Sequence, residues 1–575
     1  MSSPTSSKDD IRIVVSIDFG TTFSGYAYAH KCNPNQITVE DQWEGPVGFK
    51  TPTIIKYENK SYSTVKSWGA SALPRRRNTD QSKPIELFKL YLLNEPKLPP
   101  LPVDYRKVIT DYLKQLSEMI KENVNNTWEH LDFYSQVLIV LTIPTEFADG
   151  EIDIMRDCAY KAGLMKEKNT EAAAVYCLNA SDEVKNLKPG GKISDSLLFI
   201  TESFMIVDCG GGTVDLTCHE LLANNRIGEI TESKGGNCGS SFVDKKFKEF
   251  LRNKLGEPTF ELLEKEYYNS LQFIVQEFCE NVKIHFTGQN FKPYKIDLED
   301  YLAKYPSTLK DIVKEGKERK LLEKSEWIIT LQLDDVKKMF DPIITRIVHL
   351  IKGQLDQLQN KNKRCSAMMM VGGFSESKYL QNIINTEFKN IVISFPPIPL
   401  VAVLKGGVQF GFKVETVAKR VLKRTYGTNV VRRSQLNDPQ SEMLPNGYTI
   451  VFEPLVSRGD VIPVNDKVVQ QFRLSSLTKR VNFNMYVTKK IDAKFCNDPE
   501  VSLLRHLEVE LPESDESDES DESDDDDDDD DDYDDTIISL TLTFGTVEIL
   551  ATAKNQKTGE KYRINQKPCV KLQLE

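Results

Sequence analysis

Two short segments each place an acidic residue, glycines and threonine hydroxyls at the end of an apolar run. The first, SIDFGTTFSG, spans residues 16–25, and the second, FMIVDCGGGTVDL, spans residues 204–216, about 190 residues later. Because glycine has no Cβ, the backbone amides of such turns can approach phosphate oxygens closely. Carboxylates are ligands for Mg²⁺, and threonine hydroxyls donate to phosphate oxygens. The pair predicts a site for phosphates and Mg²⁺, with two purely structural turns as the alternative.

The pairing of the turns is more informative than either turn alone. A single Asp-x-Gly-Ser/Thr string is weak evidence in a chain of 575 residues. A second such turn in a second α/β segment indicates duplicated lobes that hold one phosphate chain from both sides. The segment KPGGKIS is not a Walker loop, because Asn186 stands where the first glycine is required and Ile193 follows Lys192.

The elements that must position these turns alternate between strands and helices from residue 11 to about residue 413. Apolar runs such as QVLIVLTI (136–143) and CSAMMMVGG (365–373) are typical of buried strands. Between them, apolar residues recur at helical spacing and predict an amphipathic helix; they are Val336, Phe340, Ile343, Ile347 and Leu350. The pattern indicates an α/β domain at 11–413, preceded by a disordered N-terminus at 1–10.

After about residue 425 the pattern changes to an alternation of period two. It is clearest in VNFNMYV (481–487) and IISLTLTF (537–544). We therefore predict a linker at 414–424 and an all-β domain at 425–575. Residues 513–535 carry 18 acids and no base, a composition that predicts a disordered insert in this domain.

Composition excludes several classes of protein. No apolar stretch approaches the ~18 residues of a membrane span, and MSSPTSSKDD lacks the features of a secretory signal. The ten cysteines are scattered without CxxC pairs, which favours reduced structural thiols. The net charge of -12 is concentrated in the acidic insert, and the rest of the chain has 74 basic against 68 acidic residues. We expect no membrane span, no nucleic-acid partner, and residence in the cytoplasm or the nucleus.

Five ordered motifs resemble the 70 kDa heat shock protein family of the actin-like ATPase superfamily. They are IDFGTTFSG, LTIPTEFADGEIDIMRDCAYKAGL, VDCGGGTVD, CENVKIHFTG and MVGGFSESKYL. The β-type segments after residue 425 look like the family's peptide-binding domain, and EAAAVYC and VLKRTYGTNVV are most similar to its divergent heat shock 70 kDa protein 12 branch. The resemblance implies an α/β fold of duplicated actin-like (ribonuclease H-like) ATPase lobes, followed by an all-β sandwich domain without a C-terminal helical lid.

The resemblance also implies roles for individual residues. Asp18, Asp208 and Thr213 match catalytic positions, and the two acids match those near Mg²⁺. The positions matching nucleotide contacts are Gly20, Thr21, Thr22, Phe23, Gly210, Gly211, Gly212, Thr213, Glu280, Lys283, Thr287, Gly372 and Gly373.

The chain departs from the family's pattern at several positions. Asn169 stands where the family has its catalytic Glu, and Ala72 stands where its phosphate-binding lysine is expected, with Lys66 and Arg75 as nearby substitutes. Ile284 takes the place of the arginine that stacks on adenine. Four basic residues interrupt the normally aliphatic linker in AKRVLKRTYG.

The resemblance predicts an ATP-hydrolysing molecular chaperone with a slow ATPase. Its cofactors would be ATP or ADP with Mg²⁺, and its partners extended peptide segments of client proteins together with co-chaperones or exchange factors. The alternative is a nucleotide-gated binding or scaffold protein with little turnover. A third reading, phosphotransfer to a small sugar, lacks a substrate base in the sequence.

Overall fold

The structure is a computed structural model, and the chain divides into two compact units. It describes residues 10–43, 48–73, 83–93, 98–145, 147, 149–166, 173–176, 203–223, 226–298, 313, 315–413, 416–474, 480–510, 536–545, 549–562 and 565–568. Unit 1 comprises Met1–Leu221 and Ser233–Val414, and unit 2 comprises Leu222–Glu232 and Glu415–Glu575. Among the helices of these described ranges, none has the length and apolar character needed to cross a membrane.

The first sheet of unit 1 is built around β1 (Ile13–Phe19), which carries the first acidic turn at its end. Its strand order is β3-β2-β1-β8-β9, with β4 paired to β2. β1 runs antiparallel to β2 and parallel to β8. The other strands are β2 (Phe23–His30), β3 (Thr38–Val39), β4 (Thr51–Pro52), β8 (Val137–Ile143) and β9 (Ala173–Tyr176).

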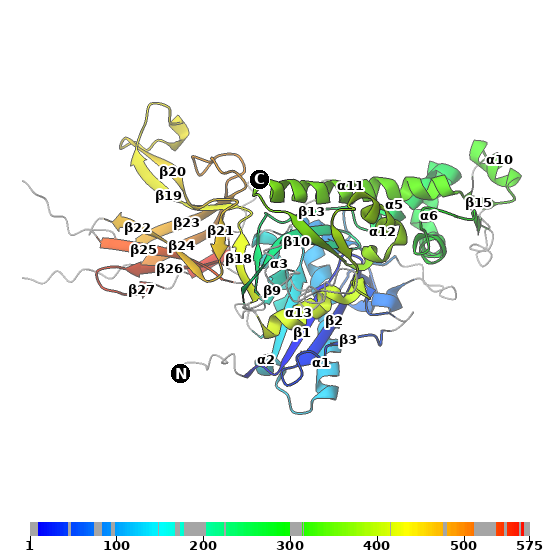
Figure 1. Ribbon diagram of the computed structural model, residues 1–575, viewed down its shortest axis with the longest axis horizontal. Helices are drawn as coiled ribbons and strands as arrows, with labels where there is room; N and C mark the ends of the chain where they lie inside the picture. Colours follow the sequence, from blue (N-terminus) through cyan, green and yellow to red (C-terminus); the bar gives the residue numbers. More distant parts are fainter. Residues whose placement is uncertain are drawn as a thin grey trace, which may run out of the picture. The chain divides into compact units, whose positions relative to one another are not determined.

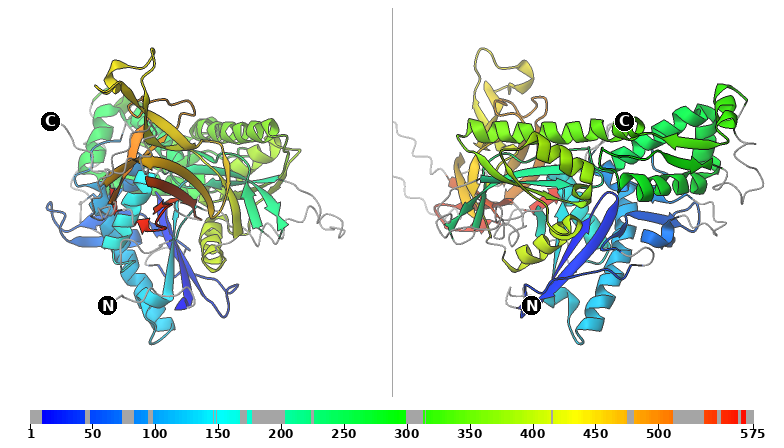
Figure 2. Two further views of the ribbon diagram at one scale, coloured as in Figure 1. Left: turned by 90° about the vertical axis from the view of Figure 1, so that its left-hand side faces the viewer. Right: turned by 45° about the vertical axis from the view of Figure 1, so that its right-hand side comes forward.

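Helices cover both faces of this sheet, which explains why β1 is buried on both sides. Ile13, Val15 and Ile17 pack in one core with α1 (Tyr105–Thr127) and α3 (Asp149–Lys161). α13 (Ala402–Phe412) lies against β1, β2 and β8, and the right-hand view of Figure 2 shows it beside the blue strands. A Cβ on Gly407 would lie 2.1 Å from Ser16 Oγ, so glycine allows this close approach.

The second sheet of unit 1 is built around β10 (Ser203–Cys209), which carries the second acidic turn. β10 pairs antiparallel with β11 (Val214–Leu222) and parallel with β16 (Cys365–Val371); β17 (Val392–Ser394) and β13 (Lys234–Gly236) pair with β16 and β11. α11 (Leu333–Asn360) runs along β13 and α5 (Ser241–Leu255) (Figure 1). The predicted amphipathic helix is confirmed, because Val336, Phe340, Ile343 and Ile347 are buried.

Shorter elements complete unit 1. β5 (Ile54–Tyr57), β6 (Val65–Trp68) and β7 (Ile85–Glu86) form a small sheet, and β14 (Tyr294–Asp297) pairs with β15 (Ile328–Leu331). The remaining α-helices are α2 (Phe133–Gln136), α6 (Glu257–Glu266), α7 (Tyr268–Phe278), α10 (Lys317–Lys324) and α12 (Lys378–Glu387). The 3₁₀ helices are η2 (Gly69–Ala72), η3 (Phe88–Leu93), η7 (Gly373–Glu376) and η8 (Pro399–Val401), and η6 (Cys279–Lys283) is a π-helix.

Unit 2 consists mainly of two antiparallel sheets. One has the order β20-β19-β23-β24-β28, and the other has the order β22-β25-β26-β27. Phe483 and Leu540, one from each sheet, belong to the same buried apolar cluster. The strands are β19 (Thr425–Arg433), β20 (Tyr448–Val456), β22 (Asp466–Leu474), β23 (Arg480–Thr488), β24 (Ser502–Glu510), β25 (Thr536–Phe544), β26 (Ile549–Asn555), β27 (Lys561–Tyr562) and β28 (Asn565–Pro568).

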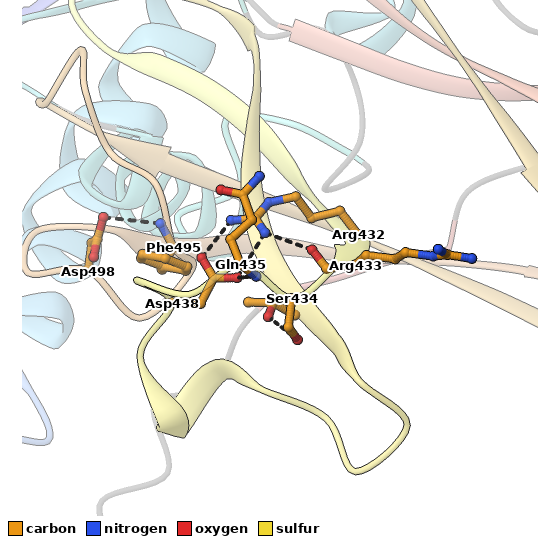
Figure 3. Close-up of polar contacts among 8 residues, drawn as sticks. Arg432, Arg433, Ser434, Gln435, Asp438, Phe495 and Asp498 are labelled. Carbon is orange, nitrogen blue, oxygen red and sulfur yellow. Dashed lines mark hydrogen bonds and ion pairs between the residues drawn. The ribbon is translucent and has the colours of Figure 1, made fainter.

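The connection between β19 and β20 contains η10 (Gln440–Glu442) and is held by an ion pair with two hydrogen bonds. Arg432 donates to both carboxylate oxygens of Asp438, at 2.8 and 2.7 Å, and the backbone amide of Gln435 donates to the same carboxylate (Figure 3). Arg433 extends away from this cluster in Figure 3. The paired geometry fixes the start of a long loop at the end of β19.

Unit 2 differs from the predicted domain limits in two ways. β18 (Val417–Val421) lies inside the segment expected as a linker and pairs with β12 (Arg226–Glu229) and β21 (Val461–Pro463). Val417 and Val421 are buried, so the apolar positions between the basic residues support a strand. Residues 222–232 also join unit 2, a long-range association that the local pattern did not predict. The predicted disordered segments, 1–10 except Asp10 and 513–535, lie outside the described residues.

Candidate nucleotide site

The two acidic turns lie against each other in unit 1. A Cβ on Gly211 would lie 1.8 Å from the hydroxyl oxygen of Thr22, and a Cβ on Gly212 would lie 2.6 Å from that of Thr21. Thr21 is buried, whereas Phe23 begins β2 and is 49% exposed. Only glycine permits this approach, so the two turns that the sequence separates form one polar surface.

Backbone hydrogen bonds fix the shape of the second turn. The amide of Gly210 donates to the carbonyl of Thr213 at 2.9 Å, which closes the turn between β10 and β11. The amides of residues 239–241, at the start of α5, donate to the carbonyls of Gly212, Gly210 and Gly211 at 2.8 to 3.1 Å. Since these carbonyls are engaged on one side, the loop is held rigidly against α5.

Asp18, at the end of β1, is paired with Lys50. The ammonium of Lys50 lies 2.5 Å from Asp18 Oδ2, and the hydroxyl of Thr142 donates to Asp18 Oδ1 at 3.2 Å. Burial alone would raise the pKa of Asp18, but the charge and hydrogen bond of Lys50, helped by Lys89, outweigh burial and lower it. Asp18 is therefore a carboxylate with a cation already beside it.

Lys89 is a second buried lysine at the first turn, a cation that the sequence alone did not identify. It lies on η3, and its ammonium donates to the carbonyl of Phe19, the residue before Gly20. The ammonium also lies 5.3 Å from the centre of the Phe19 ring. Lys66, the substitute that the sequence suggested, is exposed on β6. Lys89 lies farther along the chain than Lys66, beyond the basic segment PRRR, and its local sequence gives no sign of its position beside the first turn.

Asp208 lies opposite Asp215 across the second turn, and its carboxyl group is a weaker acid than that of an ordinary aspartate. Burial, followed by the charges of Asp215 and Asp18, raises the pKa of Asp208 to about 7, against the opposing effect of the two lysines. Asp215 Oδ1 accepts hydrogen bonds from the amide and hydroxyl of Thr145, at 2.9 and 2.6 Å. The buried Asp208 carboxylate would be stabilised in its charged form by an additional cation.

The turn after β16, in the motif MVGGFSESKYL, joins this cluster through Gly372. Gly372 follows β16 with φ +81°, and a Cβ there would lie 2.3 Å from Asp208 Oδ1. Gly373 begins η7, and a Cβ there would lie 3.0 Å from Leu400. Gly372 thus permits a close passage of the backbone beside the second acidic turn, and Gly373 permits one beside Leu400.

The segment 279–288 contributes the remaining predicted nucleotide contacts. Glu280 and Lys283 lie on the π-helix η6, a geometry often found at functional sites, and Lys283 pairs with Asp244 of α5 at 2.6 Å. The carbonyl of Thr287 accepts a hydrogen bond from Asn382 of α12 at 3.2 Å. This contact ties the segment to the helix that follows η7, whereas the side chain of Glu280 is exposed.

The donor set fits a divalent cation at Asp208 better than at Asp18. Asp208 lies beside a second acid, Asp215, whereas both oxygens of Asp18 already accept hydrogen bonds. Within the described ranges, no three histidine, cysteine, aspartate or glutamate side chains form a group suited to hold a metal ion by themselves.

Five residues of this cluster were not among the sequence predictions: Lys50, Lys89, Thr142, Thr145 and Asp215. Asp215 has a local signal, because it follows the glycine turn in GGGTVDL. The lysines have none, since Lys50 and Lys89 reach β1 from 32 and 70 residues away. The departures at Asn169 and Arg75 lie outside the described residues.

Comparisons with known proteins show which family model and which relatives the chain is similar to. The family model described as Domain of unknown function (DUF8340) matches residues 200–395. Heat shock 70 kDa protein 12A of Mus musculus is 24% identical to this chain, over 98% of the chain and 92% of the relative. Heat shock 70 kDa protein 12B of Homo sapiens is 24% identical, over 96% of the chain and 90% of the relative. These similarities confirm the predicted resemblance to the 70 kDa heat shock proteins, in the branch named heat shock 70 kDa protein 12.

Proposed function

We propose that the chain is an ATP-binding chaperone of the 70 kDa heat shock type that hydrolyses ATP slowly. The observation that carries this proposal is the close approach of the two glycine turns, at Gly211 against Thr22 and Gly212 against Thr21. Two turns with small residues and hydroxyls at one point suit a chain of phosphates. The fold we propose for the whole is a pair of actin-like lobes followed by a β-sandwich.

The residues at the turns would divide the work of holding the phosphates. The hydroxyls of Thr21, Thr22 and Thr213 would donate to phosphate oxygens, and Lys89 would place a positive charge at the terminal phosphate. Asp208 would hold Mg²⁺, with Asp18 as the second acid on the family pattern. The ion, when bound, would neutralise phosphate charge and orient the leaving group.

The nucleoside would lie between the segment 279–288 and the glycines after β16. Gly372 and Gly373 would pack on the sugar and base, while Glu280 and Lys283 would contact the ribose. Support comes from the proximity of Gly372 to Asp208, which joins the nucleoside side to the phosphate side. Lys283 would have to share its ammonium with Asp244.

Unit 2 would bind the second partner, an extended segment of a client protein. Its two antiparallel sheets share an apolar core, a scaffold on which a peptide can be bound through loops and strand edges. The nucleotide state of unit 1 would then control peptide affinity, with co-chaperones or exchange factors setting the rate of the cycle in the cytoplasm.

The second candidate is a nucleotide-gated binding protein with little turnover. It is favoured by Asn169, which on the family pattern replaces a carboxylate by a neutral amide. Ile284, 62% exposed at the adenine position, likewise offers no guanidinium for stacking.

Single-turnover hydrolysis of ATP by the full chain separates the two candidates. The ATPase predicts ADP formation that Asn169→Glu accelerates, because a carboxylate orients the attacking water better than an amide. A gated protein would bind ATP and release it unchanged, in the wild type and in the variant. Nucleotide retained after purification gives an independent reading, with ADP indicating turnover and ATP indicating a slow or inactive site.

A further inference from the structure

The ion pair between Lys50 and Asp18 occupies a position where a divalent cation would be expected. Lys50 precedes β4, which pairs with the start of β2 through Phe23–Pro52 and Ser24–Thr51. Its side chain is 8% exposed and that of Asp18 is 18% exposed, with 2.5 Å between the charged atoms. The ammonium therefore sits inside the protein beside the first turn.

The path of the Lys50 side chain is built into the fold. A Cβ on Gly25 would lie 2.9 Å from Lys50 Cγ, so the stem passes closely over a glycine of β2. Asp18 Oδ1 is engaged by the hydroxyl of Thr142, whose strand β8 runs parallel to β1. The ammonium of Lys50 thus neutralises the charge of the Asp18 carboxylate at Oδ2, while Oδ1 accepts a hydrogen bond from the neutral hydroxyl of Thr142.

We propose that Lys50 is a built-in cation that competes with Mg²⁺ for Asp18, so that the nucleotide-free protein takes up no Mg²⁺ at this carboxylate. The ion would then enter only together with phosphates, which offer the ammonium of Lys50 a new partner. The inference rests on the proposed nucleotide site for this last step alone. The competition itself is a property of the protein without nucleotide.

The physical basis is the cost of leaving one partner of a buried ion pair alone. Removing the ammonium leaves a buried negative charge, which strongly destabilises a protein unless another cation replaces it. A ligand that binds only the folded state raises its stability according to its concentration and affinity. Mg²⁺ should therefore stabilise a variant without Lys50 more than it stabilises the wild type, since any effect of Mg²⁺ at Asp208 is common to both proteins.

The test is the melting temperature of the full chain without nucleotide, with millimolar MgCl₂ or with NaCl at equal ionic strength. We expect Lys50→Met to melt several degrees below the wild type in NaCl and to recover most of that difference in Mg²⁺, so that Mg²⁺ raises its melting temperature more than that of the wild type. The control is Lys363→Met, which removes a lysine 2.9 Å from Glu220 in the same unit. Mg²⁺ should not restore that variant.

Equal effects of Mg²⁺ on the wild type and on Lys50→Met would overturn the proposal, as would a destabilised Lys50→Met that Mg²⁺ does not restore. If Lys50→Met does not fold, calorimetric titration of Mg²⁺ into the wild type decides. We expect any Mg²⁺ binding to be unaffected by Asp18→Asn, and binding that Asp18→Asn abolishes would contradict competition by Lys50. Titration of ADP with Mg²⁺ tests the nucleotide site separately, because its failure would leave the result without nucleotide intact.

Discussion

The ammonium of Lys89 should contribute more to hydrolysis than to nucleotide binding. It is buried and fixed at the carbonyl of Phe19, next to the first turn, and its charge already acts on Asp18 and Asp208. Loss of one such electrostatic contact to a phosphoryl group lowers the rate by about a hundredfold. We therefore expect Lys89→Met to reduce the single-turnover rate by about this factor.

The matched control for Lys89→Met is Lys66→Met, because Lys66 is exposed on β6. Its rate should equal that of the wild type, and the melting temperature of each variant shows whether folding is preserved. A rate that depends on Lys66 and not on Lys89 would assign the phosphate contact to Lys66 instead.

Residue chemistry was predictable from the sequence where it is local. The turns at 18–22 and 208–213 are each formed by consecutive residues, so their glycines and hydroxyls could be identified directly. Lys50 and Lys89 could not, because their positions depend on how β4 pairs with β2 and on how η3 packs beside the end of β1. Burial and long-range charge also decide the pKa of Asp208, and neither follows from the neighbouring residues.

At the scale of elements, the pair Arg432–Asp438 should stabilise the loop between β19 and β20. The hydrogen bonds from Arg432, followed by the amide of Gln435, lower the pKa of Asp438 below its usual range. We expect Asp438→Asn to increase amide hydrogen exchange and proteolysis in residues 434–447. Arg433→Gln should not, since Arg433 extends away from the cluster (Figure 3). Unchanged exchange in Asp438→Asn would show that the loop is held by other contacts.

The lowered pKa of Asp438 also determines how the stability of the loop between β19 and β20 changes with pH. Because the folded state binds the Asp438 proton more weakly than the unfolded state, the stabilisation is complete above the ordinary aspartate pKa of about 3.9. It is lost as the pH falls below that value. Amide exchange in residues 434–447 should therefore be slower in the wild type than in Asp438→Asn at neutral pH. In acid the two proteins should exchange at the same rate.

Helices and strands with a strong periodicity of apolar residues were predictable from the sequence, whereas pairings between distant segments were not. The apolar repeat of α11 and the alternation in β23 and β25 are properties of one segment each. β18 lies in the segment predicted as a linker, and only its pairing with β12 and β21 explains the strand. The pairing with β12 joins residues about 190 positions apart, which no local pattern reveals.

At the scale of the whole molecule, removal of the acidic segment 513–535 should leave folding intact. The segment lies between β24, which ends at Glu510, and β25, which begins at Thr536. Since the entropy of closing a loop changes slowly with its length, a short Gly/Ser replacement should melt at the wild-type temperature. A large fall in melting temperature would show that the acidic segment contributes to the stability of unit 2.

The same deletion tests whether the acids regulate peptide binding. If they screen a basic surface or recruit basic partners, the affinity for Lys/Arg-rich peptides should change on deletion, and the change should diminish as salt is added. If the affinity for these peptides at low salt is the same with and without the segment, the segment is only a solvated loop.

The central claim is that the two glycine turns hold the phosphates of ATP, and calorimetric titration of ATP with Mg²⁺ tests it most directly. The wild type should bind, and Gly212→Val should not, because its Cβ would lie 2.6 Å from the hydroxyl oxygen of Thr21 and fill the phosphate approach. The control is Gly353→Val on α11, where a Cβ would meet no atom of the described residues within 4 Å, and this variant should bind as the wild type does. Undiminished ATP affinity in a folded Gly212→Val variant would contradict the assignment of the site.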